Sequence, residues 1–122
     1  MDHLSNWIEI PVLDMERAKK FYREILGVGF NEMRMGGNDY ALIDIRDRFN
    51  TGSLVKGGGY VPSMQGIVVY LNCGDDLSAV LAQVTKAGGK VLLPKTFLSR
   101  EAGHIAYLLD TEGNKVGLHS MA

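Results

Sequence analysis

Cysteine is almost absent from this chain. Cys73 is the only one, which excludes an internal disulfide and fits a reducing compartment. Its place in an apolar run predicts a buried, inert thiol. No apolar run approaches the length of a membrane span, and the first residues lack the basic-then-apolar pattern of a secretory signal. These absences predict a cytoplasmic protein.

An excess of charge of one sign is also missing. Lysine and arginine number 13 against 14 aspartates and glutamates, and the formal net charge is −1. Such a chain has no basic field to gather nucleic acid or an acidic membrane, so we expect neither as a partner. The 122 residues, 46% of them hydrophobic, suffice for one domain with one core.

What the sequence does contain is an internal repeat. A strand-like run at 7–12 leads into an amphipathic helix pattern at 14–26 that stops at Gly27. A second strand-like run at 67–73 leads into a helix pattern at 76–87 that stops at Gly88, with Asp76 in the capping position that Asp14 holds in the first helix. A repeat of this size predicts two copies of one supersecondary unit that bury their faces against each other.

Each helix pattern is followed by short strand-like runs. In the first half these are 30–35, 40–46 and 51–56, separated by a turn at 36–39 and a polar loop at 46–50. In the second half they are 91–93 and 97–99 on either side of Pro94, then 104–109 and 115–119 around a turn at 110–114. Pro94 indicates an edge or a bent strand. The order is βαβββ twice, which predicts a single α+β domain over 1–122, with modules at about 5–57 and 64–122 and with curved mixed sheets around a cavity.

This order, together with its local signatures, resembles the vicinal oxygen chelate superfamily, which includes glyoxalase I, extradiol dioxygenases, fosfomycin-resistance proteins and bleomycin-binding proteins. The signatures are DMERA at 14–18, Phe21-Tyr22, Leu26-Gly27, AGGKV at 87–91 and DTEGN at 110–114. The small glyoxalase-like members are the most similar group. The resemblance implies the glyoxalase/bleomycin-resistance/dioxygenase fold, but the superfamily hosts lyases, dioxygenases, transferases and pure binders.

The resemblance also implies a test for a metal. Enzymes of the superfamily hold a divalent metal through His, Glu or Gln on the first and last strands of each module. The matching positions here are Trp7, Val68 and Gly117, and the run at 51–56 contains no such residue. We therefore expect no metal and no other cofactor. A divalent metal at a displaced site built on Glu9 and His119 is the alternative.

Strand alternation places the candidate site residues on one face. Trp7 and Glu9 share the cavity side of the first strand. The corresponding residues of the second half are Tyr70, Asn72, Gly117 and His119. We predict that Trp7, Tyr70, Asn72 and Gly117 bind a substrate, with Gly117 leaving room for a ligand or for Trp7 itself. Alternatively, Trp7 and Tyr70 simply fill the space.

Catalysis without a metal would need a proton donor and acceptor. Glu9 is the candidate general base and His119 the candidate acid, provided that they come within hydrogen-bond reach. The prediction is a glyoxalase-like protein without the standard metal ligands that binds a small organic molecule in the inter-sheet cavity. Whether it is also a metal-independent lyase- or isomerase-like enzyme is left open. Three alternatives stay open: a non-catalytic sequestering protein of bleomycin-resistance type, a metal-dependent lyase or isomerase with a displaced site, and an interaction module with a filled cavity. The resemblance implies a homodimer.

Overall fold

The two halves of the sequence form two separate sheets. The structure, a computed structural model, describes residues 2–45 and 51–122. The first half contains β1 (Ile8–Pro11), α1 (Met15–Leu26), β2 (Gly29–Met35), β3 (Asn38–Asp44) and β4 (Gly52–Lys56). The second contains β5 (Tyr70–Asn72), α2 (Ser78–Val84), β6 (Lys90–Ser99), β7 (Gly103–Leu109) and β8 (Lys115–Ser120). The α+β class and the two βαβββ units are confirmed, and the polar loop predicted at 46–50 lies outside the described residues.

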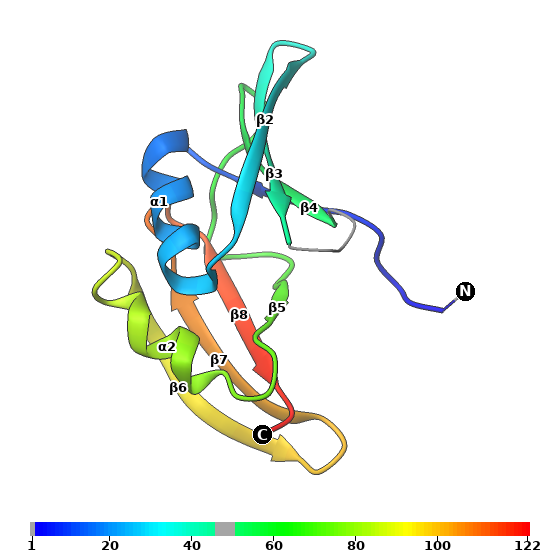
Figure 1. Cartoon of the computed structure of the whole chain (residues 1–122), viewed down its shortest axis with the longest axis vertical. Helices are drawn as coiled ribbons and strands as arrows, with labels where there is room; N and C mark the ends of the chain where they lie inside the picture. The colour runs from blue at the N-terminus through cyan, green and yellow to red at the C-terminus, as the bar shows by residue number, and fades with distance from the viewer. Residues whose placement is uncertain (1, 46–50) are drawn as a thin grey trace.

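Each unit makes a four-stranded mixed sheet of the same topology. The strand orders are β1-β4-β3-β2 and β5-β8-β7-β6, with the first and last strands of each unit parallel and the other pairs antiparallel. In Figure 1 the first sheet fills the upper half of the molecule and the second the lower half, while both helices lie on the same side. Neither helix in the described part of the chain is long and apolar enough to cross a membrane.

The first helix begins and ends as the sequence predicts. The Asp14 carboxylate accepts the N–H of Arg17 at 3.0 Å, and Gly27 closes the helix at φ 69° with its N–H bonded to the Arg23 carbonyl. The predicted apolar stripe is buried, and its two aromatic rings, Phe21 and Tyr22, pack edge to face with centroids 5.0 Å apart. This helix therefore presents one continuous apolar face to both sheets.

The second helix is shorter than the predicted 76–87. It spans Ser78–Val84, and Leu77, not Asp76, holds the N-cap position without a side-chain capping bond. The Asp76 carboxylate accepts the Ser78 N–H at 2.9 Å but also pairs with Lys95 of β6 at 2.9 Å. Because Asp76 is shared with a strand and Leu77 is fully buried, the helix begins two residues later than the capping pattern predicts.

The strands differ from prediction mainly at edges and turns. β5 covers three residues rather than the predicted run at 67–73, and it is an edge strand that pairs only with β8. β6 runs through Pro94 as one edge strand with register shifts along its pairing with β7, which confirms the predicted edge position. The turn predicted at 36–39 is confined to Gly36 and Gly37, both at positive φ, so β3 begins at Asn38.

Both halves contribute to a single core. Phe21 of α1 reaches so close to the second half that a Cβ at Gly89 would lie 2.7 Å from its ring. Glycine at position 89 therefore permits the close approach of the two units. The buried cluster comprises Ile10, Val12, Ala18, Phe21, Tyr22, Ile25, Ala41 and Leu54 from the first half and Leu77, Val84, Ala106, Leu108, Val116 and Leu118 from the second.

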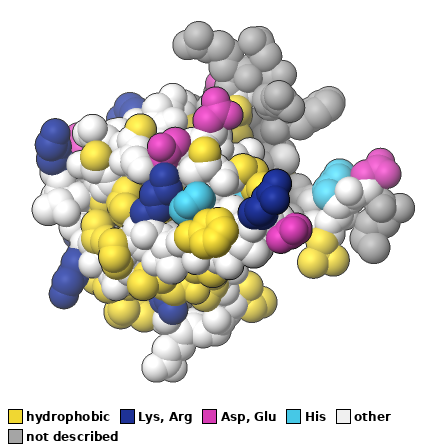
Figure 2. Space-filling view, turned by 90° about the horizontal axis from the view of Figure 1, so that it is seen from below, with side chains coloured by type: hydrophobic (Ala, Val, Ile, Leu, Met, Phe, Trp, Pro, Cys, Tyr) yellow, Lys and Arg dark blue, Asp and Glu magenta, His cyan; other side chains and the backbone are white. Residues whose placement is uncertain are grey.

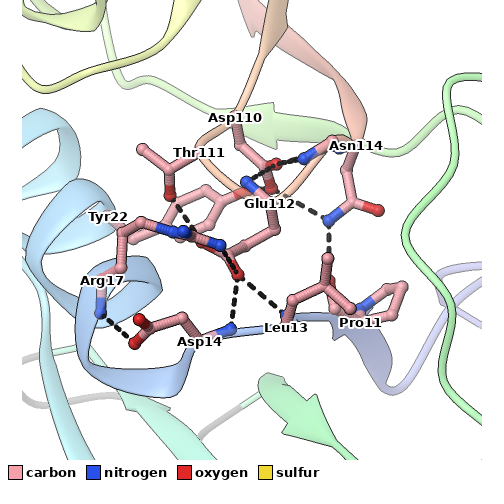
Figure 3. Close-up of polar contacts among 10 residues, drawn as sticks. Pro11, Leu13, Asp14, Arg17, Tyr22, Asp110, Thr111, Glu112 and Asn114 are labelled. Atoms are coloured by element: carbon pink, nitrogen blue, oxygen red, sulfur yellow. Dashed lines mark hydrogen bonds and ion pairs between the residues drawn. The ribbon is translucent and has the colours of Figure 1, made fainter.

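A polar junction also ties the halves together, where the turn between β7 and β8 meets the start of α1. The Glu112 side chain is fully buried, and its carboxylate accepts the N–H groups of Leu13 at 2.8 Å and Asp14 at 2.7 Å. It also accepts Nε of Arg17 at 2.8 Å and the hydroxyl of Thr111 at 2.8 Å (Figure 3). A single carboxylate of the second half thus satisfies several donors at the start of α1.

Asp110 organises the same turn from within. Its Oδ1 accepts the backbone N–H groups of Glu112, Gly113 and Asn114, and its Oδ2 accepts the Tyr22 hydroxyl at 2.5 Å. The Asn114 side chain donates to the Pro11 carbonyl at 2.8 Å. We call these residues, Arg17, Tyr22, Asp110, Glu112 and Asn114, the module clamp. The sequence signature at 110–114 is therefore both a turn and the contact that fixes one unit against the other.

Candidate functional site

A cleft of about 370 Å³ opens where the first sheet meets β5. Most of its wall is apolar, and hydroxyl and amide groups stand at a few points, which is the usual make-up of a small-molecule site. We call it the seam cleft. It is lined by Ser5, Asn6 and Ile8, by Leu26 at the end of α1 and Val28 after it, by Ile43, Ile45, Thr51 and Gly52, and by the run from Val69 to Asn72.

Tyr70 reaches its position in the seam cleft because of a glycine. Gly117 is its register partner on β8, and a Cβ there would lie 2.5 Å from Cδ1 of the Tyr70 ring. The ring therefore lies over Gly117 and crosses β8, so that its hydroxyl is 2.7 Å from that of Tyr107 on β7. Where we expected room for a ligand or for Trp7, the ring of Tyr70 takes up the space beside Gly117.

Tyr70 is a neutral phenol at physiological pH. The hydrogen bond with Tyr107, followed by burial, raises the pKa of Tyr70 to about 12, so this phenol remains protonated. The Lys115 ammonium lies 4.3 Å from the centroid of the Tyr107 ring, in cation–π geometry. Sequence reasoning did not identify Tyr107. Pairing the two strands across the turn at 110–114 would have placed Tyr107 opposite Gly117.

Glu9 lies on the exposed face of β1 and has one neutral partner. Its Oε1 accepts the hydroxyl of Tyr60 at 2.9 Å, and this bond to the carboxylate is the main reason why the pKa of Tyr60 is raised. Tyr60 belongs to the segment between the two units. The predicted base is thus held by a residue of the linker.

His119 is held elsewhere. Its Nε2 lies 2.6 Å from the Ala102 carbonyl in the turn between β6 and β7, so Nε2 carries the proton in this bond because a carbonyl can only accept. Glu9 and His119 thus have separate partners, and within residues 2–45 and 51–122 they form no hydrogen bond with each other. The geometry required for a general base and acid pair is not assembled within one chain.

The structure brings together two of the predicted substrate-binding residues. Tyr70 and Asn72 both line the seam cleft, and Trp7, 43% exposed, lies between two further lining residues, Asn6 and Ile8. The Asn72 side chain accepts the Gly74 N–H at 3.0 Å, which leaves its amide donors available. In the sheet register Asn72 is the partner of His119.

The described residues do not fit a metal at the superfamily's positions. Trp7 and Val68 offer no donor atom, and Gly117 is covered by the Tyr70 ring. Across residues 2–45 and 51–122, no three side chains of His, Cys, Asp or Glu gather as a metal site would require. Cys73 is half-buried, and burial raises the pKa of its thiol, which fits the predicted inert cysteine.

Several large hydrophobic side chains of the described residues are exposed to solvent. Ile67 is 93% exposed, Val61 75% and Phe97 60%. Figure 2 shows hydrophobic groups gathered on the lower end of the molecule, interspersed with basic side chains and a histidine. A cluster of exposed apolar side chains is typical of a binding or assembly face.

Comparisons with known proteins agree on the family. The sequence model of the bleomycin resistance protein-like N-terminal family matches residues 5–45. A glyoxylase-like domain-containing protein of Didymella fabae is 34% identical over 111 residues, covering 88% of this chain and 85% of the relative. The putative glyoxylase CFP32 of Mycobacterium tuberculosis is 30% identical over 115 residues, covering 93% of this chain.

The chain is shorter than some of these relatives. It spans 44% of the length of the mycobacterial protein. Among solved structures, the glyoxylase/bleomycin resistance protein/dioxygenase domain of Frankia sp. EAN1pec superposes with a TM-score of 0.75 at 15% identity, covering 98% of both chains. At this identity the likeness concerns the fold alone.

Proposed function

The chain belongs to the glyoxalase/bleomycin-resistance group of the vicinal oxygen chelate superfamily, and we propose that it binds a small organic molecule in the seam cleft without a metal. The observation that carries this proposal is the cleft itself. A mostly apolar wall next to the side chains of Thr51, Tyr70 and Asn72 suits a ligand with a hydrophobic body and a few hydrogen-bonding groups.

We place binding ahead of catalysis because of the geometry around Glu9 and His119. Glu9 binds the Tyr60 hydroxyl and His119 binds the Ala102 carbonyl, so neither residue positions the other for proton transfer. The matching family is described as bleomycin resistance protein-like, which supports a sequestering role. A metal-independent enzyme, lyase- or isomerase-like, would need the two residues to be brought together by a ligand or by a second subunit.

A displaced metal site is the least supported alternative, and elemental analysis tests it directly. Protein purified without chelators and analysed by inductively coupled plasma mass spectrometry should contain no divalent metal in stoichiometric amount. One metal ion per chain would contradict the proposal and favour the metal-dependent lyase.

Trp7 provides a readout of binding. It is the only tryptophan and lies next to the lining residues Asn6 and Ile8, so a neutral fluorescent probe in the seam cleft should accept its excitation energy. We expect N-phenyl-1-naphthylamine to bind with energy transfer from Trp7. In Thr51→Tyr, whose larger side chain enters the cleft from an exposed position, the affinity should fall about tenfold, equivalent to roughly 1.4 kcal/mol.

The matched control is Asn31→Tyr, which adds the same ring on an exposed residue of β2 away from the cleft lining. It should bind the probe as the unmodified protein does. The proposal would be wrong if the probe did not bind, or if both variants bound it equally well.

A further inference from the structure

A second, smaller cleft lies between β1 and β8 beneath the linker that joins the two units. Its volume is about 210 Å³. Val69 lines both this cleft and the seam cleft, so the two are neighbours. We call it the linker cleft. Its wall consists of Glu9, Ile10 and Pro11 of β1, of Val61, Ser63, Gln65 and Ile67 of the linker, of Val69, and of Asn114, Lys115 and Val116 at the start of β8.

The linker is fastened to both sides of this cleft. Ser63 donates its N–H to the Asn114 side chain at 3.1 Å and accepts the Lys115 N–H at 3.2 Å. Tyr60 donates to Glu9 on the opposite side at 2.9 Å. The Asn114 amide also bonds the Pro11 carbonyl at 2.8 Å, which brings the start of β8 against β1. The cleft is therefore held open by hydrogen bonds before any ligand arrives, which lowers the entropic cost of binding.

Residues of opposite charge from the two units line this cleft. Glu9 comes from β1, and Lys115 comes from β8 next to Asn114. Glu9 and Lys115 form no ion pair with each other. The Glu9 Oε1 has the neutral Tyr60 as its partner, and the Lys115 ammonium rests on the face of the Tyr107 ring. Within residues 2–45 and 51–122, Oε2 of Glu9 and the three donors of the Lys115 ammonium have no hydrogen-bond partner. Two residues of opposite charge, neither of them in an ion pair with the other, thus line one preformed cleft.

We propose that the linker cleft is a second ligand site, which takes a small zwitterion of the amino-acid class. The ligand ammonium would pair with Glu9, its carboxylate with Lys115, and an apolar side chain would lie against Ile67 and Val69. Each charged group alone is a common surface feature. Together in one cleft with an apolar wall, they match a molecule that carries both charges and a hydrophobic group. The site is separate from the seam cleft and does not depend on it.

The test uses L-leucine and two derivatives that each lack one charge. N-acetyl-L-leucine keeps the carboxylate without the ammonium, and L-leucinamide keeps the ammonium without the carboxylate. Titration followed by amide chemical shifts should show L-leucine bound at least tenfold more tightly than either derivative, with the largest shifts at Gln65, Ile67 and Lys115. Equal affinity for all three, or no binding of L-leucine, would overturn the proposal.

Variants assign the two charges. Glu9→Gln and Lys115→Gln should each weaken L-leucine binding about tenfold or more, while Glu101→Gln and Lys90→Gln, at exposed positions outside the cleft, should not. The derivative series with the unmodified protein keeps the test valid if a variant folds poorly. Binding of N-phenyl-1-naphthylamine in the seam cleft should be the same in all four variants. A loss of leucine binding in the control variants as well would contradict the assignment.

Discussion

At the scale of single residues, the Glu112 carboxylate joins the second unit to the start of α1. Burial by itself would raise the pKa of this carboxyl group. Hydrogen bonds from Arg17, Asp14, Thr111 and Leu13 outweigh burial and lower the pKa from 4.5 to about 2. The Glu112→Gln variant removes the charge that these donors share, and we expect it to lower the free energy of unfolding by about 2–3 kcal/mol. Urea denaturation at neutral pH measures this, with Glu101→Gln as the exposed control that should change nothing.

The same carboxylate makes part of the stability dependent on pH. Its pKa is lower in the folded protein than in the unfolded chain, so its contribution is complete above about pH 5 and is lost as the pH falls toward 2. The difference in unfolding free energy between the unmodified protein and Glu112→Gln should therefore be largest at neutral pH and shrink on acidification. A difference that stays constant from pH 7 to pH 3 would show that the clamp acts through packing and not through charge.

Gly117 determines where the Tyr70 ring lies, and tyrosine ionisation reports on it. A Cβ at position 117 would lie 2.5 Å from the Tyr70 ring, which is 42% exposed and free to swing outward. In Gly117→Ala we expect the hydrogen bond with Tyr107 to break and the pKa of Tyr70 to fall from about 12 toward the ordinary value near 10. Alkaline titration of tyrosine absorbance measures the shift, and Tyr107→Phe should reproduce it. An unchanged titration in both variants would refute the arrangement.

At the scale of elements, the two helices show how far a local pattern reaches. α1 matches its prediction because both ends are fixed by their own residues, Asp14 and Gly27. α2 starts late because Asp76 also binds Lys95 of β6, a contact between residues distant in sequence. Local capping patterns thus predict a helix end well only where tertiary contacts do not compete for the capping side chain.

The end of α1 gives a clean test of backbone conformation. Gly27 has φ 69° and open space around its Cβ position, so the cost of Gly27→Ala is that of the left-handed conformation alone. We expect a loss of about 1 kcal/mol in unfolding free energy. Gly58→Ala is the matched control, because Gly58 has equally open space without the positive φ. It should be neutral or slightly stabilising. Equal effects of the two substitutions would contradict this account of the helix end.

At the scale of the whole molecule, the exposed apolar residues predict assembly. Trp7, Tyr70 and Phe97 are 43%, 42% and 60% exposed, and burying such side chains against a second copy would remove apolar surface from water. We expect a homodimer in sedimentation velocity experiments at micromolar concentration. A single monomeric species across that range would be the opposite outcome. A dimer also offers a way for Glu9 of one chain to approach His119 of the other, whereas within one chain the two side chains have separate partners.

The hydrogen-bond partners of Glu9 and His119 depend on how the whole molecule packs. Ile10, Val116 and Leu118 alternate with the candidate site residues along β1 and β8, and they are buried in the core. This alternation could not reveal that Glu9 would bind Tyr60 of the linker or that His119 would bind Ala102. Those partners come from segments whose paths are set by packing.

The sequence by itself determined the repeated βαβββ units, the caps of the first helix, the core faces and the absence of ligands at the superfamily's metal positions. These are local properties, fixed by side-chain period, by glycine conformation and by residue type. Only the tertiary structure decided that Glu112 and Asp110 join the units, that Tyr70 lies over Gly117, and that Glu9 and Lys115 share a cleft. Each of these contacts joins residues more than 40 positions apart, and where such residues meet depends on how two sheets pack around one core, which no local pattern encodes.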